Sequence, residues 1–141
     1  MGPCSLAAMA RAAALAIVPD GKGRLLTVNR PAPPYEMSIP GGGVDPGESE
    51  RRAALRELFE ETNVVGDAAR LVWVASSPTD GRPVYVFLVT RWHGIPYPRE
   101  GGTVAWMTPG RLVEQGVVYG DFAASIFRGL PSILGRAAFA A

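Results

Sequence analysis

The chain has 141 residues, 48% of them apolar and 19% charged, and its formal net charge is +1. This length predicts one domain over residues 1–141 that buries its own core, and the composition excludes an intrinsically disordered chain. A charge this close to neutral does not favour a nucleic acid or an anionic membrane as partner.

The N-terminal segment, residues 1–10, is predicted to be loosely ordered and holds the only cysteine, Cys4. One cysteine cannot form an intrachain disulfide, which fits a reducing compartment. The Ala-rich stretch from Ala7 to Val18 lacks a basic start and is interrupted by Arg11, so it is not typical of a secretion signal. Because no run of about 18 apolar residues occurs, no transmembrane helix is expected. These features predict a cytoplasmic protein.

The part of the chain before residue 48 predicts short strands separated by turns. An apolar run followed by a turn and a second apolar run is typical of a hairpin. Glycines and prolines punctuate the rest. The predicted elements are the hairpin strands 12–18 and 24–29 around the turn 20–23, a short strand 35–39 that ends at Pro40, and a loop over 41–47.

The remaining chain predicts one long helix, further strands and C-terminal helices. Ser49 is a plausible N-cap for a helix that runs to about Thr62. The later predicted elements are strands 71–76 and 84–91 around the turn 78–81, a strand 104–107, a helix 109–115 capped by Thr108, and a helix 121–130 with a break at Pro131. This order predicts a mixed sheet covered by helices.

The helix 49–62 has an apolar face and an acidic face. At about 100° per residue, the apolar stripe comprises Ala54, Leu55, Leu58, Phe59 and Thr62. The opposite side carries Glu57, Glu60 and Glu61, with Glu50 and Ala53 nearby and Arg56 at its edge.

The three glutamates are an unfavourable choice for stability alone. At these spacings like charges repel by roughly 0.2–0.5 kcal/mol per pair, and the helix dipole disfavours negative charge near the C-terminus. One interpretation is a solvated acidic face. The other is a site for a hard divalent cation such as Mg²⁺, which prefers carboxylate oxygens and completes its coordination with water and phosphate.

The loop and the helix together resemble the Nudix box. Eight of the nine specified positions of that motif carry the expected residue type. The matching stretch comprises Gly42, Glu48, Arg56, Glu57, Leu58, Glu60, Glu61, Asn63 and Val64, and the departure is Asn63, where the family has glycine. Asparagine is the next residue best able to adopt the left-handed conformation that ends such a helix, so replacing Asn63 with glycine is expected to be neutral or slightly stabilising.

The resemblance extends over about residues 12–130. The segment 91–94, the segment 99–102 that contains Glu100, and the pair Trp106-Met107 are similar to the MutT branch of the family. The resemblance implies an α/β fold, a Nudix-type α/β/α sandwich around a mixed sheet. It also implies hydrolysis of a phosphoanhydride bond in a nucleoside diphosphate linked to another group.

The resemblance implies a metal site on the helix. Glu57, Glu60 and Glu61 would hold Mg²⁺, for which Mn²⁺ could substitute, and Gly42 could offer a carbonyl ligand. Glu100 would be a further ligand or the general base. The base stays open between Glu57, Glu61 and Glu100.

The other box residues would have supporting roles. Arg56 is expected to pair with a box glutamate and fix its rotamer. Glu48 would brace the loop against the helix, and Gly41 and Gly43 would let the backbone approach closely.

Four residues are candidates for contacts with the substrate. Arg30 could reach a phosphate, although a solvated loop arginine is an equal interpretation. Asp80 and Arg82 lie on a predicted turn at the expected mouth of the site, and Asp121 falls where the MutT branch reads the base.

The leading prediction is hydrolysis of a nucleoside triphosphate, including an oxidised one, to the monophosphate and pyrophosphate. An ADP-ribose or nucleotide-sugar pyrophosphatase is the alternative, with Pro78 as its weak support. A non-catalytic nucleotide-binding Nudix module is an alternative of another class, although such modules typically lose the box acids that this chain keeps. Both a monomer and a homodimer stay open.

Overall fold

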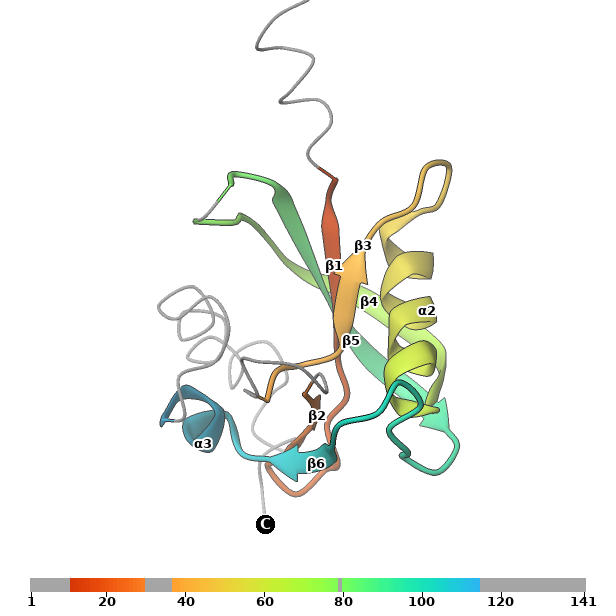
Figure 1. Cartoon of the computed structure of the whole chain (residues 1–141), viewed down its shortest axis with the longest axis vertical. Helices are drawn as coiled ribbons and strands as arrows, with labels where there is room; N and C mark the ends of the chain where they lie inside the picture. The colour runs from red at the N-terminus through yellow and green to blue at the C-terminus, as the bar shows by residue number, and fades with distance from the viewer. Residues whose placement is uncertain (1–10, 30–36, 79, 115–141) are drawn as a thin grey trace, which may run out of the picture.

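The computed structural model describes residues 11–29, 37–78 and 80–114 (Figure 1). Its central sheet is formed by β1 (Ala13–Ile17), β3 (Gly41–Gly43), β4 (Val65–Ser76) and β5 (Pro83–His93), in the order β3-β1-β5-β4. β1 is parallel to β5, whereas β3 and β4 are antiparallel to their neighbours. The predicted mixed sheet is therefore confirmed.

A second, two-stranded sheet lies beside the first. It pairs β2 (Leu25–Val28) with β6 (Val104–Met107) in antiparallel register. The predicted strand at 35–39 is represented by Ser38, which makes an isolated bridge to Val28. Residues 30–36 and 115–141 lie outside the described residues, and with them the predicted helix at 121–130 and the candidate residues Arg30 and Asp121.

A long helix lies along one side of the central sheet, and a shorter helix lies beside the second sheet (Figure 1). On one face, α2 (Glu50–Thr62) packs Ala53, Ala54 and Leu58 against buried residues of β1 and β5 such as Phe87. On the other face, Leu112 of α3 (Pro109–Glu114) joins a second buried cluster. Successive strand residues point to opposite faces, so β1 contributes to both clusters. The α/β/α arrangement follows from these two apolar layers.

The small side chains of β1 let α2 come close to the sheet. Ala14 and Ala16 face the helix and are fully buried, as is Leu58 opposite them. Fully burying a leucine side chain contributes roughly 1.5–3 kcal/mol, and dense packing depends on matching small residues to large ones. This contact fixes the position of α2 relative to the strands. The apolar stripe predicted for the helix was wrong at Phe59, which is 39% exposed, whereas Ala53 is buried.

The predicted hairpin between 12–18 and 24–29 was wrong beyond its turn. Asp20 closes the turn, because its carboxylate accepts hydrogen bonds from the Lys22 and Arg24 N–H groups. The two arms are joined near the turn by the bond from the Asp20 N–H to the Arg24 carbonyl, by the bridge from Pro19 to Leu25 and by the bond from the Leu26 N–H to the Val18 carbonyl. β2 then leaves β1 and pairs with β6.

The predicted loop over residues 41–47 was wrong in its first part. Gly41–Gly43 form β3 and pair with Ala13–Leu15. Three glycines lack the side chains that mark a strand, and glycine is depleted in strands. The consequence of the glycines is a strand whose surface is bare backbone, directly beside α2. Two later strands were placed correctly but drawn too short, since β4 begins at Val65 and β5 extends to His93.

Among the described residues, no helix has the length and apolar character needed to cross a bilayer.

Candidate active site

The two ends of α2 are fixed by local side-chain and backbone geometry. Ser49 is the N-cap, and its Oγ accepts the Arg52 N–H at 3.1 Å. Asn63 is the C-cap, with a φ of 65° in the left-handed region, and its N–H donates to the Phe59 carbonyl at 2.9 Å. Both features were predicted from the sequence. They fix the residues at which the helix begins and ends.

The acidic side of α2 faces the glycine strand, and it is not a uniformly solvated face. A Cβ atom at Gly42 would lie 2.6 Å from the Glu57 carboxyl carbon. The Gly41 N–H donates to Glu61 Oε1 at 3.1 Å. The Glu57 side chain is consequently only 17% exposed. The missing side chain at Gly42 is what allows the Glu57 carboxylate to lie directly against the strand.

Arg56 is the centre of an ion-pair network that joins the loop to the helix. Its guanidinium binds both oxygens of Glu48, with Nε to Oε2 at 2.8 Å and one Nη to Oε1 at 3.0 Å. The other Nη donates to Oε1 of Glu57 at 3.0 Å and to Oε1 of Glu60 at 3.1 Å. A further bond reaches the Gly43 carbonyl at 3.1 Å. One planar, always charged group therefore orients three carboxylates at once.

The network changes the protonation equilibrium of Glu48. Hydrogen bonds from Arg56, followed by one from the Asp45 N–H at 3.1 Å, lower the pKa of Glu48 to about 2. The same hydrogen bonds to Glu48 raise the pKa of Arg56 above its already high value. Both groups are thus charged throughout the neutral range. Asp45 extends the network to Arg11, whose Nη lies 2.8 Å from its Oδ1.

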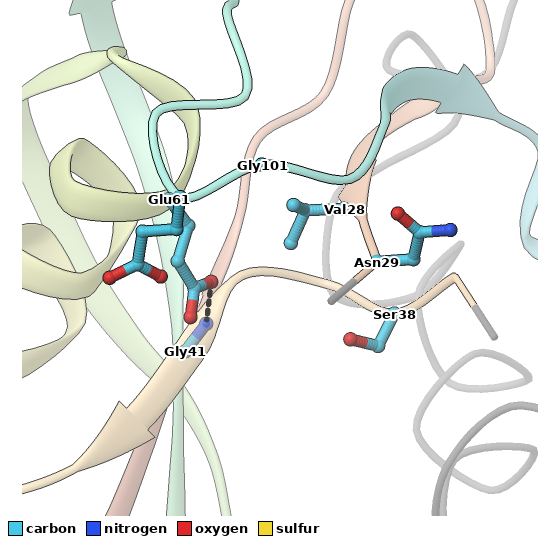
Figure 2. A pocket seen from close by; sticks show the side chains of 7 residues that line it. Val28, Asn29, Ser38, Gly41, Glu61 and Gly101 are labelled. Atoms are coloured by element: carbon cyan, nitrogen blue, oxygen red, sulfur yellow. Dashed lines mark hydrogen bonds between the residues drawn. The ribbon is translucent and has the colours of Figure 1, made fainter. Parts of the chain in front are cut away.

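A small pocket lies where the start of β3, the C-terminal part of α2 and the segment after β5 meet (Figure 2). Glu61 and Glu100 both line it, together with Val28, Asn29, Ser38, Gly41 and Gly101. Figure 2 shows Glu61 directed at the Gly41 nitrogen. The two glutamates are separated by 39 positions in the sequence, and the fold brings them to one cavity.

The carboxylates are suitable donors for a hard cation, although they are not gathered into a ready cluster. Among the residues that the structure describes, no group of three His, Cys, Asp or Glu side chains surrounds a common point. Glu57 and Glu60 turn toward Arg56, and Glu61 turns toward Gly41. The donor types fit Mg²⁺ or Mn²⁺, because such ions need few protein carboxylates. Because Gly42 has no side chain, the Glu57 carboxylate lies close to the strand backbone, which fits a site where several oxygen donors gather around one ion.

Other predicted substrate residues lie apart from this centre. Arg82 Nε pairs with Asp80 Oδ2 at 2.7 Å in the turn between β4 and β5. The Arg82 N–H is the first cause of a lowered pKa at Asp80. By strand register, Val84 is next to Ala13, which pairs with Gly43, so this turn lies beyond the Gly43 end of β3. The pocket lies at the Gly41 end.

Three polar residues near the site were not predicted. Asp45 lies between Arg11 and Arg56 in the loop before the helix. Asn29 and Ser38 line the pocket. Asn29 follows directly after a buried strand, which was the available signal. The Asn29 side chain accepts a hydrogen bond from the Thr103 N–H, 74 residues away, and sequence spacing does not reveal such a partner.

Comparison with known proteins gives one family. The NUDIX domain model matches residues 9–124. A Bacillus subtilis (strain 168) protein, provisionally named as an 8-oxo-dGTP diphosphatase, is 33% identical over 101 residues, which are 70% of this chain and 67% of that protein. Diphosphoinositol polyphosphate phosphohydrolase 2 of Rattus norvegicus is 34% identical over 80 residues, 57% of this chain.

A solved structure has a similar fold. The crystal structure of the MutT NUDIX hydrolase from Burkholderia pseudomallei superimposes with a TM-score of 0.62 at 25% identity, over 71% of this chain and 84% of that one. The chain spans 45% of the length of the rat relative, so the likeness to that relative concerns only part of it.

Proposed function

Because the chain belongs to the Nudix hydrolase family, we propose that it hydrolyses a phosphoanhydride bond in a nucleoside diphosphate linked to another group, with a divalent cation as cofactor. The observation that carries the proposal is the contact between the acidic side of α2 and the glycine strand. Glu57 lies against Gly42, and Glu61 accepts the Gly41 N–H. Two carboxylates one helical turn apart thus face bare backbone beside a pocket.

The cation would be held by Glu57, Glu60 and Glu61, with the Gly42 carbonyl as a further donor. Bound Mg²⁺ or Mn²⁺ would neutralise charge on the phosphate oxygens of a polyanionic substrate. Arg56 orients Glu57 and Glu60 through its Nη atom, and Glu48 orients Arg56 through its two oxygens. An arginine within a cluster of acids has a use here, because Arg56 fixes the rotamers of glutamates that must act together.

The proton from the attacking water would pass to a glutamate at the pocket. Glu61 and Glu100 line the same cavity, and Glu57 lies one helical turn before Glu61. These three are the candidates for the general base. A base acts on a proton within hydrogen-bond reach, either directly or through one water. The shared pocket favours Glu61 or Glu100 for this role.

The size of the pocket limits what it can hold. Its volume is about 50 Å³. Pockets for whole drug-sized ligands are about 300–1,000 Å³, so this cavity suits the reacting phosphate and its water, with the base and sugar held elsewhere. Arg30 and Asp121, which were predicted to contact substrate, lie outside the described residues.

We propose a nucleoside triphosphate as the substrate, cleaved to the monophosphate and pyrophosphate. The support is the Bacillus subtilis relative, whose provisional name gives an oxidised nucleoside triphosphate as its substrate. ADP-ribose and nucleotide sugars stay as the second class. The rat relative adds diphosphoinositol polyphosphates to the substrates that a test must include.

A hydrolysis panel tests the proposal. It would contain common and oxidised nucleoside triphosphates, ADP-ribose, nucleotide sugars and a diphosphoinositol polyphosphate, each with Mg²⁺, with Mn²⁺ and with EDTA. Chromatography would resolve the products. Release of pyrophosphate from a triphosphate supports the leading substrate, and cleavage of ADP-ribose to AMP supports the second. Nucleotide binding without any turnover would instead support a non-catalytic module.

Glu61→Gln is the matched test of the site. The change removes a charge but little volume, so the fold should persist while turnover falls by several orders of magnitude. Glu50→Gln, at the first turn of the same helix, is the control and should leave turnover unchanged. Millimolar Mg²⁺ should raise the thermal midpoint of the unaltered chain, because a ligand that binds only the folded state stabilises it. Equal turnover in both variants would contradict the assigned site.

A further inference from the structure

We propose that Asn63 is a positioning residue, whose side-chain amide fixes the segment between β5 and β6 to the end of α2 and so holds Glu100 beside Glu61. The part of this inference that concerns turnover rests on the proposed function. Asn63 is also the specified position at which the chain departs from the Nudix box. The contact described below is therefore one that the glycine of the motif could not supply.

The backbone of Asn63 explains only part of the choice of residue. Its φ of 65° and the bond from its N–H to the Phe59 carbonyl are features that glycine would also provide. The asparagine adds a side-chain amide, and its Nδ2 donates to the Ile95 carbonyl at 3.2 Å. Ile95 lies 32 residues further along the chain, in the segment that leads to Glu100. The side chain thus joins two distant parts of the site.

Two further residues of the same segment bind the last turn of α2. The Tyr97 N–H donates to the Thr62 carbonyl at 2.8 Å. Arg99 donates to the Phe59 carbonyl at 3.3 Å, and its guanidinium carbon lies 4.3 Å from the centre of the Phe59 ring. The Thr62 carbonyl lies in the last turn of the helix, where carbonyls lack intrahelical donors, so the Tyr97 N–H supplies a partner that it needs. The Phe59 carbonyl already accepts the Asn63 N–H, and Arg99 adds a second donor to it. Figure 1 shows it passing across the C-terminal end of α2.

The other side of Glu100 is anchored to β2. The Thr103 N–H donates to Asn29 Oδ1 at 2.7 Å, and the Asn29 N–H donates to the Thr103 carbonyl at 3.1 Å. Gly102 has a φ of 79°, and a Cβ there would lie 2.5 Å from the Asn29 carbonyl oxygen. Glu100 therefore lies between an anchor on α2 and an anchor on β2.

Burial does little to hold this segment. The side chain of Ile95 is 80% exposed, that of Tyr97 is 61% exposed, and Glu100 is also exposed. Segments with few buried apolar contacts open readily unless hydrogen bonds restrain them. The bond from Asn63 is consequently one of the hydrogen bonds that restrain the approach to Glu100. Losing it should let Glu100 move relative to Glu61 without unfolding the core.

Asn63→Gly and Asn63→Asp are the test variants. Glycine and aspartate can both adopt the left-handed conformation, and at neutral pH neither has a side-chain donor for the Ile95 carbonyl. We expect kcat to fall by about tenfold with little change in KM, since a displacement of 1 Å can cost about a hundredfold in rate. Arg24→Ala removes an ion pair in the remote turn at Asp20 and should leave both constants unchanged.

Two readouts separate positioning from a purely structural effect. Hydrogen exchange at the Tyr97 amide should become faster in Asn63→Gly, while exchange at the amide of residue 63 stays slow. The second readout combines Asn63→Gly with Glu100→Gln. If Asn63 acts through Glu100, the double variant should lose little more rate than Glu100→Gln alone, because effects on one unit are not additive.

The outcomes distinguish this inference from the proposed function. Unchanged exchange at Tyr97, or fully additive losses in the double variant, overturns the positioning role even when the chain is an active hydrolase. If the unaltered chain hydrolyses nothing in the panel, the proposed function fails and the effect on turnover fails with it. Exchange at Tyr97 then still decides whether Asn63 anchors the segment.

Discussion

Replacing Arg56 with alanine should destabilise the folded chain by about 2 kcal/mol at neutral pH, and the loss should disappear in acid. Arg56 binds Glu48 through two hydrogen bonds, and also reaches Glu57, Glu60 and the Gly43 carbonyl. Without the guanidinium, the carboxylates of Glu48, Glu57 and Glu60 lose the positive group that they share. The side chains of Glu48 and Glu57 are less than one-fifth exposed, so water compensates for the loss only in part.

The magnitude follows from the pKa of Glu48. A fall from 4.5 to about 2 corresponds to about 3.4 kcal/mol of preference for the charged form in the folded state. The side chains of Glu48 and Arg56 are 16% and 28% exposed, so water screens the pair. Exposed pairs contribute about 0–1 kcal/mol and breaking buried ones costs about 3–5, which places this partly buried network near 2 kcal/mol.

The sign of the pH dependence is fixed by the direction of the shift. A carboxyl whose pKa is lower in the folded state contributes stability that is complete above its unfolded pKa, and that stability is lost as the pH falls through the folded pKa. For Glu48 the loss begins near pH 4.5 and is complete near pH 2. The free energy of unfolding of Arg56→Ala should therefore differ most from that of the unaltered chain above pH 5.

Urea denaturation at pH 7, 5 and 3.5 measures this difference. Arg51→Ala, an exposed arginine on the same helix, is the matched control and should shift stability by less than about 0.5 kcal/mol. Arg56→Lys should fall between the two, because an ammonium cannot reproduce the paired bonds to Glu48. The reasoning would be refuted if the free energies of unfolding of Arg56→Ala and of the unaltered chain differed as much at pH 3.5 as at pH 7.

Two further substitutions test the glycine strand and the start of the helix. Gly42→Ala should lower kcat by roughly a hundredfold, because the new Cβ would displace the Glu57 carboxylate by an ångström or more. Gly110→Ala is the control, since a Cβ at that position would meet open space. Equal kcat values for the two variants would contradict the role of Gly42. Ser49→Ala should lower the free energy of unfolding by about 1 kcal/mol in urea denaturation, because it removes the acceptor of the Arg52 N–H, whereas Ser49→Asp should be nearly neutral. A loss in Ser49→Asp as large as in Ser49→Ala would exclude the capping explanation.

The sequence predicted the parts of the site that depend on local geometry. Ser49 and Asn63 have side chains and backbone preferences that mark the ends of a helix, and the structure places the helix between them. The spacing of Glu57, Glu60 and Glu61 then put all three on one side of it. These features need only residues within a few turns of one another, so a single sequence contains the information.

The parts that the sequence did not predict depend on distant partners. Nothing in Leu25–Val28 indicates that its partner is β6, whose residues lie 76 to 82 positions later. Gly41–Gly43 have no side chains to form an alternating pattern, so their pairing with β1 could not be detected. The bond from Asn63 to the Ile95 carbonyl, 32 positions later, was likewise not predicted, and the expectation that glycine would be neutral at position 63 stays a prediction.

The balance of charge around Arg56 helps to explain why α2 tolerates three neighbouring glutamates. Among the described residues, Glu48, Glu57 and Glu60 contact the single guanidinium of Arg56, and Glu61 accepts one strand N–H, so the acids bound directly to Arg56 outnumber its one positive charge. Arg56 offsets part of the repulsion among these acids, and we propose that a divalent cation fills the remaining deficit of positive charge. A lysine or arginine in place of Glu60 or Glu61 would stabilise the helix end through its dipole, but it would remove that deficit. Under the proposed function, the acidic helix end therefore gives up stability for cation binding.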